Sequence, residues 1–586
     1  MDSVGTRWGR HGRLLRRYLA PQRAMALVMA AALIISTVLQ LASPRLVRGF
    51  IDAATAGAPL KVLYRLALGF LAMSLLTQAV KVAAEYWSER VAWVASNALR
   101  LDLVRHILDL DANFHRAHTP GELIERVDGD ANALAGLFSS FTVRIVGSLL
   151  LLLGVVASLL WESPVLGAAF GAFAILAAVL LGWVERLAVP VLTQSREHSA
   201  SFYGYLSEAI SARDDLRTCG ALPYAFGRFR GLLHAWLPVQ LRAGVLGNVV
   251  WIAALLVFAL ADALAYALGG GLYRRGVLSL GTVYMILTYA ALVAQPLETL
   301  RTELQHLQQA EAGLERVIGL LAIRSRLPEG TADLPPGPLS VEFHGVSFRY
   351  DDGDDGGGAD ILREVSFRLD AGRRLGILGR TGSGKTTVAR LLTRLYDPRV
   401  GAVRLGGVDL RDANLHSVRA RAALVSQDVR LLQASVRHNI TLFRGDVPDA
   451  LLVEVLQELG LGPWLRRLPD GLDTPVARAG LSGGEAQLLA FAPVMLRDPG
   501  LVVLDEASSR LDLETEETLV MAVERLLQGR TAVIITHRPA TMERVDDLLI
   551  LEDGRVVEYG PRLVLTASPA SRSYQLGQVE AKGVLG

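Results

Sequence analysis

Six apolar segments in the first half of this chain constrain its fold more than any other feature. Each is close to the roughly 20 residues that a helix needs to cross the hydrocarbon layer of a bilayer. The second is the weakest, because Lys81 and Glu85 lie at its end. The segments span about 24–43, 64–84, 145–161, 163–184, 243–263 and 276–297. The pattern predicts a multi-pass membrane protein with an all-α, six-helix transmembrane domain over residues 24–322.

The residues before the first apolar segment predict its orientation. Residues 1–23 are rich in arginine, and such basic flanks stay on the cytoplasmic side of a membrane. The segment that follows is too long for a secretory signal, and five more come after it. Six crossings return the chain to its starting side. Both termini are therefore predicted to be cytoplasmic, with the protein in the cell (inner or plasma) membrane.

Two charged connections between the apolar segments, roughly 81–144 and 185–242, are too long for ordinary loops. Their helical pattern predicts that the membrane helices continue into the cytoplasm and turn there. The Pro-Gly pair in HTPGEL (118–123) is a turn signal inside the first connection. Within the membrane domain, Asp262 is a candidate functional residue, because ionisable groups in such segments are rare. The alternative is that the fifth segment simply ends near it.

Composition divides the chain and excludes some classes of protein. Residues 323–340 contain a stretch rich in Pro and Gly that reads as a linker, residues 341–575 resemble a soluble α/β domain, and 576–586 form a tail. The net charge of +2 argues against a nucleic-acid partner. Cys219 is the single cysteine, so no internal disulfide forms, and it is expected to be a small packed side chain.

The α/β half contains a phosphate-binding loop between an apolar strand and a helix pattern. The stretch GRTGSGKT fits G-x-x-x-x-G-K-[ST], in which glycines let successive backbone N–H groups surround phosphates. Lys385 is predicted to neutralise the β- and γ-phosphates of ATP, and the Thr386 hydroxyl to bind Mg²⁺. The predicted ATP-binding residues of this loop are Gly379, Arg380, Thr381, Gly382, Ser383, Gly384, Lys385, Thr386 and Thr387.

Polar residues at the ends of three other apolar strands complete a hydrolytic set. In LVVLDEASSRLD (501–512), Asp505 is placed to reach Mg²⁺ and Glu506 to accept a proton from the attacking water. An acidic pair at a strand end is also a common helix cap, but the phosphate loop favours catalysis. His537 follows the strand of TAVIITHR and is predicted to contact the γ-phosphate. Gln427 in LVSQD is predicted to contact Mg²⁺ and the water, although alone it is a weak signal.

With LSGGE (481–485) added, the motifs resemble the ATP-binding cassette of ABC transporters, and the whole chain resembles an exporter-type half-transporter. The membrane half adds FHRAHTPGELIERVDGD (114–130) and SEAISARDDLRTCGALPYAFGRF (207–229), which resemble the intracellular loops of that family. The resemblance implies that Tyr350 stacks on adenine. It also implies that two cassettes pack head to tail, so that Ser482, Gly483 and Gly484 contact the nucleotide held by the partner chain.

This chain departs from the family pattern at the signature. Glu485, Ala486 and Leu488 replace the usual glutamine and two basic residues, VARAG (476–480) replaces an acidic segment, and Arg510 replaces a common alanine. Glu506 and His537 are intact. Because the signature serves the partner's nucleotide, we expect a heterodimer in which this chain supplies the competent hydrolytic face. A homodimer with tolerated variation is the alternative.

The expected function is ATP-driven export of an apolar or amphipathic substrate such as a drug, lipid or hydrophobic peptide. The membrane segments are rich in Ala, Leu and Val, with few aromatic residues and few charges. An importer built on the exporter architecture and a mainly regulatory ATP-binding subunit remain alternatives. Neither is separated from export by these motifs alone.

Overall fold

The computed structural model describes residues 13–14, 16–136, 143–350, 359–426, 430–505, 513–536 and 542–572, apart from some side chains in 294–309 and those of 513–517. The chain divides into two compact units. The first contains the residues up to Leu108 and then 120–323, and the second contains 109–119 and the residues from Arg324 onward. The short segment 109–119 therefore belongs with the α/β half, although it lies between membrane helices in the sequence.

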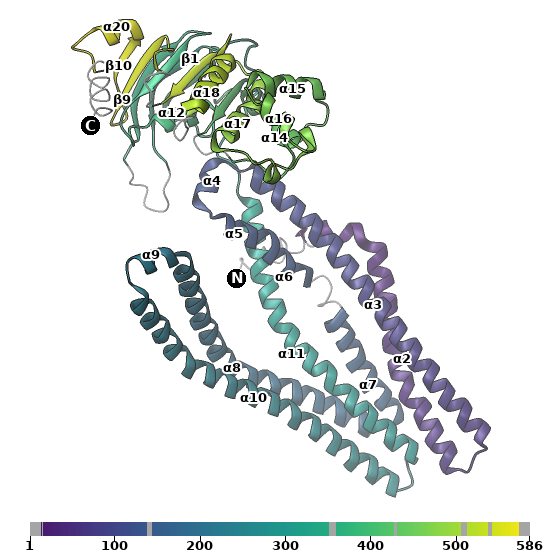
Figure 1. Ribbon diagram of the computed structural model, residues 1–586. Coiled ribbons are helices and arrows are strands. Elements are labelled where there is room, and N and C mark those ends of the chain that lie inside the picture. The colour runs from purple at the N-terminus through teal and green to yellow at the C-terminus, as the bar shows by residue number, and fades with distance from the viewer. Residues whose placement is uncertain are drawn as a thin grey trace. The chain divides into compact units, whose positions relative to one another are not determined.

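The first unit is a set of long helices (Figure 1). Five helical segments in the described part of the chain are long and apolar enough to cross a membrane, and α11 adds a shorter apolar stretch, Leu280–Val293. A helix of 50 residues such as α3 is about 75 Å long, far more than the roughly 30 Å of hydrocarbon. The principal helices are α2 (Arg23–Thr55), α3 (Leu60–Asp109), α7 (Gly147–Glu162), α8 (Pro164–Ser211), α10 (Leu222–Arg274) and α11 (Leu280–Ala322).

Short elements connect these helices. A 3-10 turn, η1 (Ala20–Gln22), precedes α2, and α9 (Arg213–Thr218) lies between α8 and α10. Between α3 and α7 lie α5 (Pro120–Ile124), the π-helical turn η2 (Glu125–Asp130) and α6 (Ala131–Gly136). Cys219 is the C-cap of α9 and is exposed, so the expectation of a packed thiol was wrong. Asp262 is exposed on α10, which continues to Arg274.

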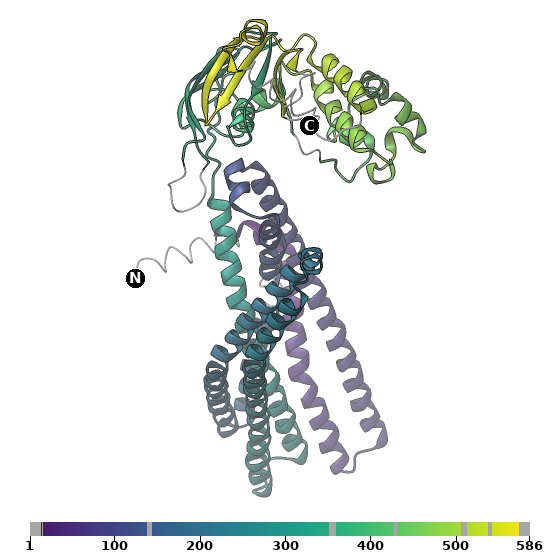
Figure 2. The same cartoon turned by 60° about the vertical axis from the view of Figure 1, so that its left-hand side comes forward.

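Apolar side chains of α7, α8, α10 and α11 form the core of the first unit. Phe170 and Tyr289 are fully buried there, and the Tyr289 hydroxyl donates a hydrogen bond to the carbonyl oxygen of Leu41 in α2 at 2.8 Å. Beyond this core, α8 and α10 continue side by side to α9 as a hairpin (Figures 1 and 2). Ser195 of α8 donates to the side chain of Gln240 in α10 at 2.6 Å, which joins the two helices along the hairpin.

The second unit contains two sheets. An antiparallel sheet has the strand order β2-β1-β4-β5, and a mainly parallel one has the order β10-β9-β3-β8-β7-β6. The strands are β1 (Val341–Phe348), β2 (Leu362–Leu369), β3 (Arg374–Leu378), β4 (Val400–Leu405), β5 (Val408–Asp409), β6 (Ala422–Val425), β7 (Leu501–Asp505), β8 (Thr531–Ile535), β9 (Asp547–Glu552) and β10 (Arg555–Pro561). All residues of β7 and β8 are buried, which explains their uninterrupted apolar sequences.

Helices cover these sheets and form a separate helical lobe. Near the sheets lie α12 (Lys385–Leu392), α13 (Leu415–Arg421), α18 (Leu513–Leu527) and α20 (Arg562–Ala567). The lobe contains α14 (Val436–Thr441), α15 (Asp449–Glu458), α16 (Gly462–Arg467), the 3-10 turns η4 (Gly471–Asp473) and η5 (Val476–Arg478), and α17 (Gly483–Arg497). Its core, which includes Trp464 and Phe491, is continuous with the buried face of β7 and β8.

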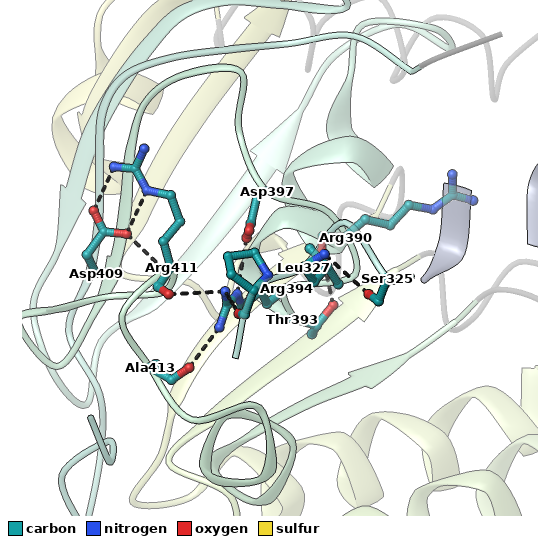
Figure 3. A network of polar contacts seen from close by, with 10 residues as sticks. Ser325, Leu327, Arg390, Thr393, Arg394, Asp397, Asp409, Arg411 and Ala413 are labelled. Atoms are coloured by element: carbon teal, nitrogen blue, oxygen red, sulfur yellow. Dashed lines mark hydrogen bonds and ion pairs between the residues drawn. The ribbon is translucent and has the colours of Figure 1, made fainter. Parts of the chain in front are cut away.

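The linker is anchored to the second unit by a buried arginine just after α12 (Figure 3). The Arg394 side chain has no exposed surface. Its guanidinium donates to the carbonyl oxygens of Pro328 and Ala413, both at 2.7 Å, and also bonds the Asp397 carboxylate at 3.1 Å. A buried guanidinium needs this number of acceptors to compensate for its lost hydration. The linker residue Pro328 is thereby held close to the end of the phosphate-loop helix.

Candidate functional site

The order of the parallel sheet explains how motifs far apart in the sequence meet. Strands β3, β8, β7 and β6 are adjacent and parallel, so their carboxyl ends lie on one edge. The phosphate loop follows β3, and Asp505 ends β7 opposite Ile535 at the end of β8. Ligands of open parallel sheets bind outside the carboxyl ends of the strands. The sheet therefore brings the phosphate loop and Asp505 to one site.

The phosphate loop has the backbone conformation that its glycines permit. Gly379, Gly382 and Gly384 have φ angles of +156°, +85° and +104°. A Cβ atom added to Gly384 would lie 2.6 Å from a methyl group of Leu362, so an L side chain there would be strained by its φ angle and would force that methyl group to move. Gly384 is the N-cap of α12, and the N–H groups of the first helical turn have no intrahelical acceptor.

Two buried polar groups of the loop indicate that it fits a phosphate. The Ser383 hydroxyl is buried and has no hydrogen-bond partner among the described residues. The Lys385 ammonium is also buried and donates to the carbonyl oxygens of Gly379 and Arg380 at 2.7 and 3.0 Å. A buried hydroxyl without a partner is costly, and a phosphate oxygen would supply one. Arg380, Thr381, Gly382 and Thr386 are exposed around this cradle, whereas Thr387 is buried.

The residues proposed for metal binding and catalysis are only partly described. Asp505 is buried at the end of β7, and Thr386 is the second residue of α12. A hydroxyl and a carboxylate are hard oxygen ligands of the kind that Mg²⁺ prefers. Glu506, Gln427 and His537 lie outside the described residues, so their roles remain sequence predictions.

Tyr350 lies after β1, beside the phosphate-loop helix. Its hydroxyl is 3.2 Å from the Thr387 hydroxyl and accepts a hydrogen bond from the Arg390 guanidinium at 3.0 Å. The ring also contacts Phe348 and Tyr396 in edge-on geometry. Desolvation by burial raises the pKa of Tyr396, so this second phenol stays neutral at physiological pH. The Tyr350 ring is thus placed by contacts on several sides.

The signature segment forms the start of α17. Its hydrogen bonds give a structural reason for the unusual glutamate at position 485. Ser482 is the N-cap, and its hydroxyl accepts a hydrogen bond from the Glu485 N–H at 3.1 Å. The Glu485 carboxylate accepts in return from the Ser482 N–H at 2.9 Å and pairs with Arg467 of α16 at 3.1 Å. Glu485 thus completes a capping box. Gly483 and Gly484 occupy the first two helical positions, where backbone N–H groups have no intrahelical acceptor.

A P-loop cassette joined to a bundle of membrane-spanning helices defines an ATP-powered membrane transporter. The ABC transporter transmembrane region family matches residues 26–297, and the ABC transporter family of ATP-binding domains matches residues 362–509. The chain belongs to the ABC transporters and has the exporter architecture, a helical membrane domain followed by one α/β nucleotide-binding domain. It is accordingly a multi-pass membrane protein with an ATP-dependent transport activity.

Individual relatives support this assignment. The chain is 31% identical over 481 residues to an ATP-dependent lipid A-core flippase of Chromohalobacter salexigens, covering 81% of this chain and 82% of the flippase. It is 30% identical over 555 residues to a multidrug efflux ATP-binding/permease protein of Mycobacterium tuberculosis, covering 93% of this chain and 45% of that protein. A bacterial Atm1-family ABC exporter with ATP bound has a TM-score of 0.77 at 25% identity, covering 96% of this chain and 99% of that one.

Two contacts near the site could not be anticipated from the motifs. Arg467 is 18 residues from Glu485, in a different helix, and nothing in its sequence context marks it. Arg116 lies in the segment 109–119, and its guanidinium sits 4.3 Å from the centre of the Tyr350 ring. The only sequence signal for the second contact is that segment's resemblance to an intracellular loop of the exporter family.

Proposed function

We propose that this chain is one subunit of a dimeric exporter that moves amphipathic molecules outward across the cell membrane, driven by hydrolysis of Mg·ATP. The observation that carries the substrate class is a pair of neighbouring cavities in the helical unit. Both are lined by α2, α3 and α11, and Gln40 borders both. One cavity is polar and the other is mainly apolar, which matches a molecule with a polar head and an apolar body.

The polar cavity, of about 320 Å³, contains charged groups that sequence composition gave no reason to expect together. Lys81 and Glu85 of α3 line it with Arg144, which precedes α7. Arg144 pairs with the buried carboxylate of Glu303 at 3.0 Å. Lys81 and Glu85 form no ion pair with any residue that the structure describes. These two groups are therefore available to the polar or charged head of a substrate.

The second cavity, of about 290 Å³, suits the apolar body of the same molecule. Its lining includes Phe70 of α3, Pro44 and Val47 of α2, and Leu292 of α11. Phe70 lies ten residues, or about 15 Å, from the start of α3 at Leu60, and Lys81 lies 21 residues, or about 32 Å, from it. With the α2–α3 turn on the outer side, the polar cavity lies near the inner border of the roughly 30 Å hydrocarbon layer. A polar cavity at that border is suited to receive the head of a substrate that enters from the cytoplasmic leaflet.

A second half-transporter completes the nucleotide sites in this proposal. The free N–H groups of Gly483 and Gly484 at the start of α17 are suited to the phosphate of a nucleotide held by the partner. We favour a heterodimer, because the altered residues lie in the signature whereas the proposed base Glu506 and His537 are retained. The α8–α10 hairpin extends beyond the core of its own unit, which offers a long surface to a partner (Figure 1).

The proposed chemistry is in-line attack of water on the γ-phosphorus. Catalysis of this reaction depends mainly on positioning and charge stabilisation. Lys385 and the loop N–H groups hold the phosphates, and Glu506 accepts the proton of the attacking water. Thr386, Asp505 and Gln427 would hold Mg²⁺, which neutralises charge on the β- and γ-phosphates when bound. His537 orients the water and the γ-phosphate.

The test is translocation of fluorescently labelled phosphatidylethanolamine and phosphatidylglycerol in proteoliposomes. Wild-type protein should flip at least one of these probes with ATP, and Glu506→Gln should bind ATP without turnover or translocation. Lys81→Ala should reduce translocation, whereas the matched variant Lys61→Ala, near the start of α3, should not. ATP-driven flux in the opposite direction would establish import. ATP turnover that remains equal to wild type in Glu506→Gln would remove the proposed base.

The same preparations decide the subunit composition. Vigorous ATP turnover by this chain alone, abolished by Glu506→Gln, would establish a working homodimer. Negligible turnover from folded protein, restored by co-expression with a second half-transporter, is the outcome expected for a heterodimer.

A further inference from the structure

The segment 109–119 is fixed to the nucleotide-binding unit by its own side chains. Asp111 is buried, and one carboxylate oxygen caps α4 (Ala112–Ala117) by accepting from the Phe114 N–H at 3.1 Å. The other oxygen accepts from the backbone N–H of Arg326, at the start of the linker, at 2.6 Å. Ala112 packs against the core around the first sheet. These contacts give α4 a defined position beside the end of β1.

Arg116, on the last turn of α4, occupies the face of Tyr350. Its guanidinium carbon lies 4.3 Å from the ring centre, which is the distance of a stacked cation–π pair. The ring itself is held by the hydrogen bonds of its hydroxyl to Thr387 and Arg390 and by edge contacts with Phe348 and Tyr396. Turning the ring away from Arg116 would break these contacts. The position of the ring is therefore held by groups other than Arg116.

An adenine stacked on this face would need the layer that the guanidinium fills. Stacked rings lie about as far apart as a guanidinium and the ring it covers, so the base and Arg116 exclude each other there. A bare triphosphate has no base and therefore does not need the layer that Arg116 fills. The contact thus distinguishes a nucleotide with a base from a bare phosphate chain.

We propose that Arg116 is a nucleotide-responsive positioning residue, which adenine displaces from Tyr350 when ATP binds. This inference rests on the proposed stacking role of Tyr350. Displacement frees the end of α4, a segment whose chain continues into the helical unit at both ends. The two effects are reciprocal. If ATP binding weakens the contact between Arg116 and Tyr350 by a certain factor, that contact weakens ATP binding by the same factor. Nucleotide binding thereby affects segment 109–119, which connects two membrane helices in the sequence.

The test compares the affinities of AMP-PNP and inorganic tripolyphosphate for full-length protein in nanodiscs. Arg116→Ala and the longer polar variant Arg116→Gln should bind AMP-PNP about two- to fivefold more tightly than wild type, the scale of a partly exposed cation–π contact. Tripolyphosphate affinity should not change, because it has no base. Arg228→Ala removes a comparable arginine from Tyr205, at 4.9 Å and in the other unit, and should leave both affinities unchanged.

The Tyr350→Ala background separates failure of this inference from failure of the nucleotide site. Tyr350→Ala should weaken AMP-PNP binding, and Arg116→Ala should then have no further effect. If Tyr350→Ala weakens AMP-PNP binding but Arg116→Ala leaves it equal or weaker, displacement of Arg116 is refuted and the stacking site stands. If Tyr350→Ala has no effect on AMP-PNP binding, the stacking assignment itself is wrong.

Discussion

The pairing of Glu485 with Arg467 predicts that replacing Glu485 lowers the stability of the fold but raises the affinity for ATP. Glu485 is buried to about four fifths and contributes a negative charge at the start of α17, where a phosphate of the partner's nucleotide is proposed to bind. Glu485→Gln retains an amide oxygen that can accept the Ser482 N–H, so the cap persists. It removes the negative charge and the ion pair with Arg467. The perturbation therefore changes charge while leaving the local geometry in place.

Glu485→Gln should affect the stability of the fold and the affinity for ATP in opposite directions. Arg467 is 71% exposed, so the lost ion pair is worth only about 0.2–1 kcal/mol, and the lost interaction with the helix dipole adds about 0.3–1 kcal/mol. At an assumed separation of about 8 Å, a phosphate charge is repelled by the carboxylate by about 0.5 kcal/mol in water and about 2 kcal/mol at the effective dielectric constant of a protein surface. Glu485→Gln should therefore lower unfolding stability slightly and lower half-saturating ATP by about two- to thirtyfold, since 1.36 kcal/mol corresponds to a factor of ten.

A double-mutant cycle measures the coupling directly. Arg467→Ala leaves the carboxylate uncompensated, so it should raise half-saturating ATP for turnover by the assembled dimer. The same substitution in the Glu485→Gln background should have no effect. The assay is ATPase activity against ATP concentration, with thermal unfolding in the same nanodiscs. The reasoning is refuted if Arg467→Ala acts equally in both backgrounds, or if Glu485→Gln leaves half-saturating ATP unchanged.

Three further predictions concern particular contacts of the second unit. Gly384→Ala places a methyl group at φ +104° against a neighbouring leucine, so the unfolding free energy should fall by about 1–3 kcal/mol; an unchanged denaturation midpoint would contradict this. Asp111→Ala removes the cap of α4 and its bond to the linker, so amide hydrogen exchange in 112–117 should quicken by about tenfold; wild-type exchange rates there would show that the cap is dispensable. Arg437 holds the pKa of Asp449 and of Asp473 below the usual range, so the stabilisation is complete above the pKa of an unfolded aspartate and is lost as pH falls towards the folded values. Thermal unfolding from pH 6 to pH 3 should show a smaller acid destabilisation in Arg437→Gln, and equal pH profiles would rule the contact out.

The local chemistry of the phosphate loop could be predicted because it depends on residue type at fixed spacing. Glycines at 379, 382 and 384 predict a backbone that other residues do not adopt, and the structure gives all three positive φ angles. Long apolar stretches likewise predict membrane helices, because hydrocarbon requires about 20 such residues regardless of their partners. The membrane domain, the α/β half and the family were all accessible in this way.

The sequence did not predict contacts that depend on distant elements. Cys219 was expected to be packed, but the turn that carries it leaves the thiol exposed, since burial depends on neighbours that spacing does not reveal. Lys81, Glu85 and Arg144 lie at the ends of apolar segments in the sequence, and the structure brings Lys81 and Glu85 of α3 together with Arg144, which precedes α7, in the lining of one cavity. A count of charges along a chain says nothing about whether they converge.

Sequence alone thus determined the class of protein, the phosphate loop and the strand-end motifs, because each follows from short-range stereochemistry or from the length of an apolar segment. Tertiary structure decided that Glu485 closes a capping box and pairs with Arg467, and that Arg116 covers Tyr350. Both depend on which elements pack together, and packing is set by the whole set of buried surfaces rather than by any local pattern.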